Sequence, residues 1–205
     1  MIMRKVGIMG GTFDPIHIGH LILGEAAYEQ YSLEKVLFMP AGRPPFKEGR
    51  KGMASNEQRT EMVRRAIASN PHFELSMLEM NEDGMSYTYR TLEKLKEEHP
   101  DTVYYFVMGA DSLMYFDTWM NPQRIADAAI IVVATRNHMP QESLDEKIRQ
   151  LTEKFHASIR KLETPNLDIS SSQIREWVSQ GRGIQYYVPD PEIHYIEEQG
   201  LYQDI

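Results

Sequence analysis

Residues 10–20 read Gly-Gly-Thr-Phe-Asp-Pro-Ile-His-Ile-Gly-His, between a short apolar segment and a longer helical pattern. The apolar segment is 4–9, and the helical pattern covers 18–31. A glycine-rich turn from a strand into a helix lets backbone N–H groups approach a phosphate closely, and the helix dipole adds its positive end. His17 and His20 are three positions apart, so they share one face of the helix. The stretch therefore predicts a nucleotide phosphate site, with phosphoryl or nucleotidyl transfer as the chemistry.

Apolar strand patterns alternate with helical patterns along the rest of the chain. Several strand patterns are short, continuous and apolar, which is typical of parallel strands buried on both faces. The alternation predicts right-handed crossovers and a doubly wound, Rossmann-like α/β sheet with helices on both faces. The expected strands are 4–9, 35–40, 72–77, 102–108, 129–134 and 157–162, and the expected helices are 18–31, 55–69, 88–98, 121–127, 141–155, 172–180 and 190–198.

The length and composition favour one domain. The chain has 205 residues, which is enough for a substantial core, and no shift in composition divides it. We expect a single domain over 1–205, with a small helical C-terminal part over about 165–205. Segment 41–53 is long for a simple connection and rich in Gly, Pro and charge, which favours a functional loop.

The charge balance and the cysteine count exclude several kinds of function. There are 30 acidic against 22 basic residues, and the net charge of -8 argues against broad nucleic-acid binding, which needs a basic face. No stretch is apolar over the length of a membrane span, and the N-terminus has no signal-peptide pattern. The lack of cysteine excludes disulfides and thiolate sites. We therefore expect a cytoplasmic protein without nucleic-acid or membrane partners.

A second candidate phosphate site is the run Ser-Ser-Ser-Gln-Ile-Arg at 170–175. Ser170 and Gln173 fit a capping box, and a well-capped helix alone would explain that pattern. Three hydroxyl groups at a helix N-terminus also suit a phosphate, and Arg175 would face the same ligand one turn further on. Together with the first motif, this run could hold a triphosphate at both ends.

Other candidate residues follow strands or stand in restrained loops. Lys47 follows two prolines that stiffen its loop, although a solvated lysine is the commoner arrangement. Asp111 comes just after the strand 102–108 and could accept from ribose hydroxyls or cap the next helix. Arg136 follows the strand expected at 129–134. Trp119 could stack on a flat heterocycle, although tryptophan more often belongs to a core.

With these motifs the chain resembles the bacterial nicotinate-mononucleotide adenylyltransferases, of the nucleotidyltransferase superfamily with the His-Ile-Gly-His signature. That signature is shared with pantetheine-phosphate adenylyltransferases, cytidylyltransferases and class I aminoacyl-tRNA synthetases. The elements Ser86-Tyr87-Thr88 and Thr118-Trp119 narrow the resemblance. The chain differs from many members in Asn137-His138, where they have Pro-Gly. The similar segments are 10–20, 45–47, 86–88, 109–111, 118–119, 169–175, 187–189, 195–196 and 200–202.

The resemblance implies roles on the ATP side of the site. The two histidines would contact the phosphates and steady the transition state, and Lys47 would reach a phosphate from its loop. Gly109 and Asp111 would hold the adenosine ribose, and Arg175 with the preceding serines would bind the departing pyrophosphate. The implied catalytic residues are His17, His20, Lys47 and Arg175, and the implied ATP-binding residues are Gly10, Gly11, Thr12, Phe13, His17, His20, Gly109, Asp111, Ser171, Ser172 and Arg175.

The resemblance also implies roles in binding nicotinate mononucleotide, the acceptor of the adenylyl group. Thr88 and Met120 would offer backbone amides to the nicotinate carboxylate, and Trp119 would stack on the pyridine ring. Arg136 would contact the mononucleotide phosphate, and Lys47 belongs to the same substrate-binding set.

The implied reaction is adenylyl transfer from ATP to nicotinate mononucleotide, giving nicotinate adenine dinucleotide and pyrophosphate in NAD biosynthesis. Mg²⁺ is expected to enter with ATP and to keep most of its waters. We expect no metal site built by protein ligands. A zinc site on His17 and His20 is a minor candidate, because a third ligand is needed. Two more candidates are a different transferase with the same signature and a non-catalytic nucleotide-binding protein. The expected partners are ATP and nicotinate mononucleotide, and a homo-oligomer stays open.

Overall fold

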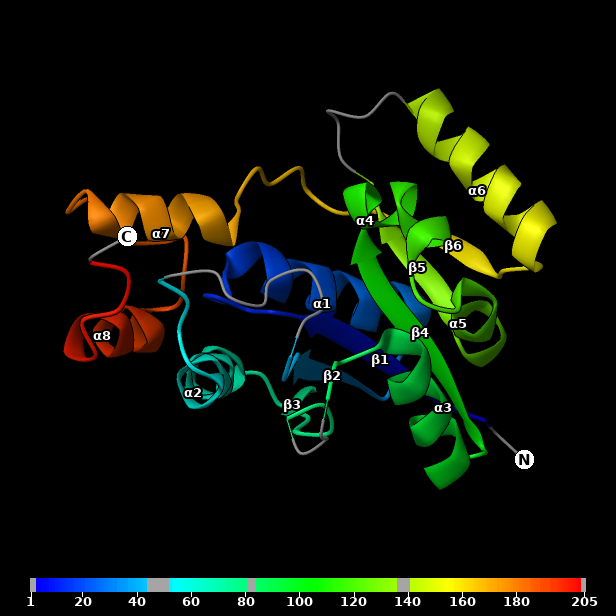
Figure 1. The fold of residues 1–205 in the computed structure, drawn as a ribbon, viewed down its shortest axis with the longest axis horizontal. Coiled ribbons are helices and arrows are strands. Elements are labelled where there is room, and N and C mark those ends of the chain that lie inside the picture. Colours follow the sequence, from blue (N-terminus) through cyan, green and yellow to red (C-terminus); the bar gives the residue numbers. More distant parts are fainter. Residues whose placement is uncertain (1–2, 44–51, 81–83, 136–140, 204–205) are drawn as a thin grey trace.

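A parallel β-sheet forms the centre of the fold (Figure 1). The computed structural model of the protein describes residues 3–43, 52–80, 84–135 and 141–203. Within these ranges, six parallel strands form one sheet in the order β3-β2-β1-β4-β5-β6. The strands are β1 (Arg4–Gly11), β2 (Lys35–Pro40), β3 (Phe73–Leu75), β4 (Thr102–Gly109), β5 (Ile130–Ala134) and β6 (Ile159–Leu162).

The sheet is buried on both faces because its central strands are almost continuously apolar. In β4, Tyr105 and Val107 belong to one buried cluster, while Tyr104 and Phe106 belong to the other, as the two-residue period of a strand requires. Helices α1 (Ile18–Tyr31), α2 (Asn56–Ile67), α7 (Ser171–Ser179) and α8 (Asp190–Glu198) supply the first cluster. Helices α3 (Thr88–Glu98), α4 (Ala110–Met114), α5 (Pro122–Ala128) and α6 (Gln141–Phe155) supply the second.

The strand order changes direction between β1 and β4, which lie side by side in the sheet (Figure 1). Strands β2 and β3 follow on one side of β1, and strands β5 and β6 follow on the opposite side, beyond β4. Ligands of open parallel sheets bind beyond the carboxyl ends of the strands at such a point. Gly11 ends β1 and Gly109 ends β4, so both glycine segments singled out in the sequence lie at this place.

Every strand and helix expected from the sequence is present, and the doubly wound α/β fold is confirmed. The expected strand 72–77 is shorter, at Phe73–Leu75, and the helix expected at 172–180 begins one residue earlier. Helix α4 and the 3₁₀ turn η1 (Phe116–Thr118) were not expected. Helices this short carry no apolar period, so the pattern could not indicate them.

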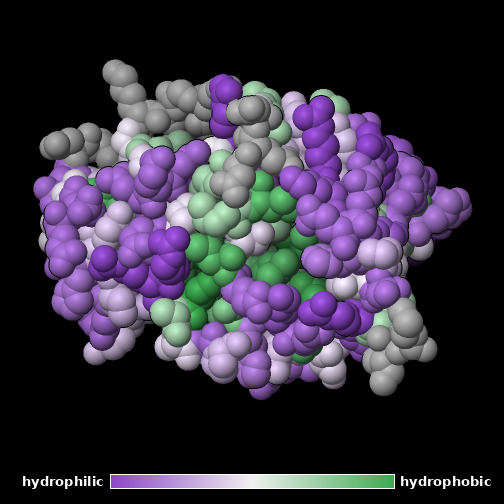
Figure 2. Space-filling view, turned by 90° about the horizontal axis from the view of Figure 1, so that it is seen from below, coloured by the Kyte–Doolittle hydropathy of each residue, from purple (hydrophilic) through white to green (hydrophobic). Residues whose placement is uncertain are grey.

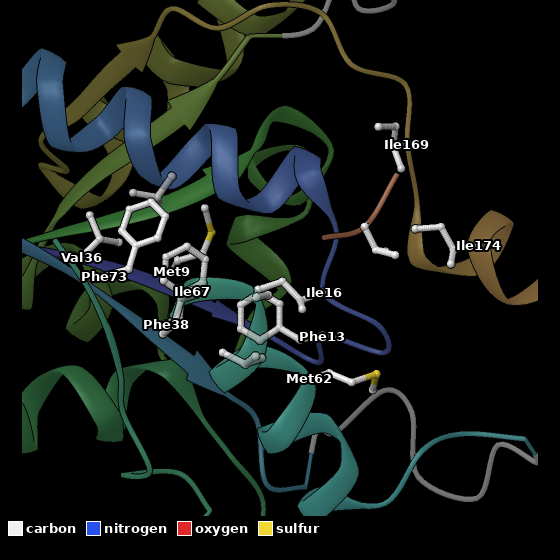
Figure 3. Packing of buried hydrophobic residues seen from close by; sticks show 14 of the residues in the cluster. Met9, Phe13, Ile16, Val36, Phe38, Met62, Ile67, Phe73, Ile169 and Ile174 are labelled. Carbon is white, nitrogen blue, oxygen red and sulfur yellow. The ribbon is translucent and has the colours of Figure 1, made fainter. Parts of the chain in front are cut away.

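Residues of the first motif pack between α2 and the C-terminal segment. Phe13 and Ile16 are buried with Met62 of α2, and Ile169 and Ile174 complete the same cluster (Figure 3). Phe13 has a left-handed backbone, with φ at 50°. Because apolar side chains hold it on several sides, the turn between β1 and α1 has a defined shape.

The face of the molecule shown in Figure 2 is mostly hydrophilic. Seen from below in Figure 2, hydrophobic residues gather in a hollow in the middle of one face, with hydrophilic residues around them. Among the residues that the structure describes, no helix combines the length and the hydrophobicity needed to cross a membrane.

Candidate functional site

The two histidines of the first motif lie at the N-terminus of α1. His17 is the N-cap residue and only 5 % exposed, and its ring stacks on that of His20 with the centroids 3.7 Å apart. Nδ1 of His20 accepts a hydrogen bond from the backbone N–H of His17, at 3.2 Å. Gly19 allows this packing, since a Cβ there would come within 3.0 Å of His17 Nδ1. Because Nδ1 accepts, a neutral His20 ring carries its proton on Nε2, where it is a donor.

The serine motif meets these histidines in one cleft of about 290 Å³. Ser170 caps α7: its Oγ accepts from the N–H of Gln173 at 3.2 Å, and Gln173 Oε1 accepts from the N–H of Ser170 at 3.0 Å. The capping box expected from the sequence is therefore confirmed. Two helix N-termini, those of α1 and α7, lie at the cleft, and each brings the positive end of its dipole. The residues that line it are His17, Gly19, His20, Ile22, Leu23, Ala134, Thr135, Thr164, Pro165, Leu167, Ile169, Ser170, Ser171 and Ser172.

Helix α7 is attached to the turn of the first motif by polar contacts. Nη1 of Arg175 donates to the main-chain oxygen of Asp14 at 2.6 Å, and it lies 3.7 Å from Asp14 Oδ2. Ser171 Oγ donates to the main-chain oxygen of Pro15 at 2.9 Å. Arg175 is not among the described residues that line the cleft. Ser172 does line it, and Nη2 of Arg175 lies 3.4 Å from Oγ of Ser172. The prediction that these two motifs act together is consistent with this geometry.

Arg59 of α2 holds the same turn from another element. It is 2 % exposed, and its Nη1 donates to the main-chain oxygen of Thr12 at 2.6 Å. Its Nη2 donates to the main-chain oxygen of Ala41 at 2.7 Å and to Asn56 Oδ1 at 2.6 Å. Burial lowers the pKa of Arg59, and the nearby Asp14 opposes that effect. The guanidinium thus joins the end of β1 to the first residue of segment 41–53, a role that no sequence motif indicated.

A second cleft, of about 170 Å³, lies at the carboxyl end of β1, where Gly10 and Gly11 line it. The N–H of Thr88 lies at the first position of α3, where a helix provides no acceptor for it. Trp119 stands with its ring at 75° to Phe106, the centroids 6.3 Å apart. The residues that line the cleft are Ile8, Gly10, Gly11, Thr12, Met39, Ala41, Glu79, Ser86, Thr88, Thr91, Leu92, Phe106 and Trp119.

The remaining predicted residues lie around these clefts or outside the described part. Met120, 53 % exposed, lines a neighbouring cleft together with Thr88 and Trp119. Asp111 is exposed in the first turn of α4 and lines an opening beside Trp119. The Phe13 ring is buried against Phe38, so only its backbone can face a ligand. Lys47 and Arg136 lie outside the described residues.

The second cleft contains an acidic residue that no motif indicated. Oε1 of Glu79 accepts a hydrogen bond from Thr91 Oγ1 at 2.7 Å, and both residues line the cleft. Beside it, the backbone N–H groups of Gly42 and Arg43 donate to Ser86 Oγ at 3.0 and 3.1 Å. These contacts join the start of segment 41–53 to the segment before α3, and they shape one wall of the cleft.

Gly42→Ala is expected to lower the free energy of unfolding by about 1–3 kcal/mol, as overpacking does. A Cβ at Gly42 would lie 2.3 Å from the main-chain oxygen of Glu79, so two backbone segments would have to separate. Urea denaturation measures the loss. Gly183→Ala is the matched control, because a Cβ there would meet nothing within 4 Å. Equal stability of the two variants would contradict the close approach at Gly42.

The chain is similar to known proteins over most of its length. The profile of the family described as Cytidylyltransferase-like matches residues 8–177. A relative from Lachnoclostridium phytofermentans, named "Probable nicotinate-nucleotide adenylyltransferase", is 43% identical over 98% of this chain and 100% of its own length. A relative from Roseiflexus with the same name is 43% identical over 99% of this chain and 100% of its own.

A solved structure supports the fold independently. The nicotinic acid mononucleotide adenylyltransferase of Plasmodium falciparum, complexed with NaAD, superposes with a TM-score of 0.79. It is 23% identical in sequence, and the match covers 97% of each chain. The sheet and its helices are therefore shared over nearly the whole length.

Proposed function

The chain belongs to the cytidylyltransferase-like family and, within it, to the nicotinate-nucleotide adenylyltransferases, and from this premise we propose that it transfers the adenylyl group of ATP to nicotinate mononucleotide. The products are nicotinate adenine dinucleotide and pyrophosphate. One observation carries the proposal: residues of the stretch 10–20 line two clefts, His17 and His20 the first, with the serine motif, and Gly10, Gly11 and Thr12 the second, with Thr88 and Trp119. A triphosphate in the first cleft and a pyridine nucleotide in the second would place their phosphates beside the same glycine turn.

The chemistry is a direct displacement. A phosphate oxygen of the mononucleotide forms a bond to the α-phosphorus of ATP, and the bond from that phosphorus to the oxygen bridging to the β-phosphate breaks. The nucleophile is an anion near neutral pH, so no general base is required. Catalysis then depends on in-line positioning and on donors placed where negative charge develops. A site with two histidines, hydroxyl groups and helix N-termini has these properties.

The residues of the first cleft would act on the triphosphate. Nε2–H of His20 would donate to a phosphate oxygen, with His17 stacked behind it. Ser171, Ser172 and Arg175 would hold the pyrophosphate as it leaves. The backbone from Gly10 to Phe13 would follow the phosphates, Gly109 and Asp111 would bind the ribose, and Lys47 and Arg136 would add positive charge.

The residues of the second cleft would recognise nicotinate. The N–H groups of Thr88 and Met120 would donate to its carboxylate, while Trp119 would stack on the pyridine ring. Trp119 has Phe106 and Phe116 against it, and this packing favours one orientation of the indole.

Mg²⁺ would enter as the complex with ATP. Among the residues described, no group of three or more His, Cys, Asp or Glu side chains is arranged to hold a metal ion. Phosphate oxygens and water are the ligands that Mg²⁺ prefers at nucleotide sites, so ATP itself supplies what the described side chains do not. The ion would neutralise charge on the phosphates when bound.

Nicotinate mononucleotide is expected to exceed the corresponding amide mononucleotide in kcat/KM by about 100-fold. A carboxylate accepts from both backbone N–H groups, whereas the amide nitrogen would turn its own donors toward them. Release of pyrophosphate, measured with each acceptor at several concentrations, gives the ratio. Equal values would refute the carboxylate site.

The same assay tests the competing functions. Pantetheine phosphate with ATP, and phosphorylated alcohols with CTP, are the matched comparisons. No pyrophosphate with any acceptor, in folded protein that binds ATP, would indicate a non-catalytic nucleotide-binding protein. Beyond the reaction, we propose a single domain over residues 1–205 and a cytoplasmic location.

A further inference from the structure

Asp14 is the residue on which distant parts of the chain converge. It is 2 % exposed, and its Oδ1 accepts from the backbone N–H of Ala54 at 3.1 Å and from the hydroxyl of Tyr202 at 2.7 Å. Tyr202 is 5 % exposed and is 188 residues away in the sequence. Burial and the neighbouring Asp14 raise the pKa of Tyr202, so its hydroxyl keeps the proton that it donates.

The other side of Asp14 faces Arg175. Its Oδ2 has no hydrogen-bond partner among the described residues, but it lies 3.7 Å from Arg175 Nη1, which donates to the main-chain oxygen of the same residue. The guanidinium therefore has two acceptors on one residue, a carbonyl in contact and a carboxylate slightly further away. Any rotation of the carboxylate would change how strongly it pairs with the guanidinium.

We propose that Tyr202 is a positioning residue for pyrophosphate: its hydroxyl fixes the Asp14 carboxylate, which in turn directs Arg175 toward the leaving group. This inference rests on the proposed role of Arg175 in adenylyl transfer. With two donors on Oδ1, the carboxylate is kept from turning fully onto the guanidinium, and Arg175 retains N–H groups for phosphate oxygens. Without the tyrosine hydroxyl, the carboxylate would turn and withdraw Arg175 into a closer ion pair.

Tyr202→Phe tests this by removing one oxygen atom. In the reverse reaction, from nicotinate adenine dinucleotide and pyrophosphate, KM for pyrophosphate is expected to rise about tenfold, the effect of one hydrogen bond to a charged group. KM for the dinucleotide is expected to stay within about twofold, because it has no contact with Arg175 in this scheme. A hydroxyl with a purely structural role would lower the amount of active enzyme and leave KM for pyrophosphate unchanged.

Tyr195→Phe is the matched control on the neighbouring helix. Tyr195 packs against Arg65, whose guanidinium carbon lies 4.5 Å from the ring centroid. Arg65 belongs to α2, so this contact does not involve the turn between β1 and α1. Its variant is expected to keep the wild-type KM for pyrophosphate. If Tyr202→Phe does not fold, Asp14→Asn is the second test: it keeps an oxygen for Tyr202 but removes the charge that is proposed to direct Arg175, so KM for pyrophosphate should rise. An unchanged KM in folded Asp14→Asn would overturn the inference.

Arg175→Lys separates the proposed role of Tyr202 from the proposed role of Arg175. If it raises KM for pyrophosphate and folded Tyr202→Phe does not, the role of Tyr202 is refuted while the proposed function stands. If Arg175→Lys leaves that KM unchanged, the proposed role of Arg175 fails, and the inference fails with it. The result that supports the inference is a rise in both single variants, with a double variant Arg175→Lys and Tyr202→Phe no worse than Arg175→Lys alone.

Discussion

His20→Ala is expected to lower kcat for adenylyl transfer by about 100- to 1,000-fold, the loss seen when one donor to a developing negative charge is removed. The Nδ1 of this ring is engaged with the backbone N–H of His17, at 3.2 Å, so the ring has a fixed orientation and its proton belongs on Nε2. Phe13 also packs edge-on against the ring, with the centroids 5.1 Å apart. If His20 acts on ATP as proposed, its Nε2–H would already be oriented when ATP binds, and this is the condition under which such a donor contributes most.

KM for ATP in His20→Ala is expected to change much less than kcat, because the donor acts mainly on charge that appears in the transition state. Steady-state kinetics of pyrophosphate release measures both constants. His99→Ala is the control, since His99 is exposed beyond the end of α3 and its backbone alone bonds to the helix. Turnover near the wild-type level in folded His20→Ala would refute the role.

Arg59→Met is expected to lower the free energy of unfolding by about 3–5 kcal/mol, the cost of leaving buried polar partners unpaired. Its guanidinium is 2 % exposed and has three acceptors, the main-chain oxygens of Thr12 and Ala41 and the side chain of Asn56. Methionine fills a similar volume but donates to none of them. The two segments that hold Thr12 and Ala41, both of which line the second cleft, would lose their common donor.

The stability of Arg59→Met is measured by urea denaturation, beside Arg64→Met on the same helix. Arg64 is 56% exposed and pairs with Glu61 across one turn, so its replacement is expected to cost about 1 kcal/mol or less. A loss for Arg59→Met as small as that for Arg64→Met would show that the buried guanidinium does not stabilise the turn.

Local patterns in the sequence were enough to predict the strands, the longer helices and the capping box of α7. Continuous apolar runs such as 102–108 predicted buried parallel strands, and Ser170 with Gln173 predicted the N-terminus of α7. Both signals come from residues close together in the sequence, and the structure confirms both. That the second cleft lies at the switch between β1 and β4 also follows from strand alternation.

Contacts between distant residues could not be predicted in this way. Arg59 is in a strongly charged stretch, Glu57 to Arg65, where arginine is usually exposed. Tyr202 is near the end of the chain and meets Asp14 only through folding. Glu192 is fully buried in α8, and burial raises its pKa well above the ordinary value, yet the sequence around it resembles a solvent-facing helix start. Periodicity reports which face of a helix is apolar, not which polar side chain is enclosed.

The contact between Tyr202 and Asp14 has a consequence for the order of events during synthesis. A nascent chain that has emerged as far as β6 already has all the strands of the described sheet, and it can form most of its buried clusters. The turn between β1 and α1 still lacks its contacts with Arg175 and Tyr202, because these two residues leave the ribosome later. Competence to hold pyrophosphate would therefore come after the sheet has formed, once translation of α8 and the residues beyond it is complete.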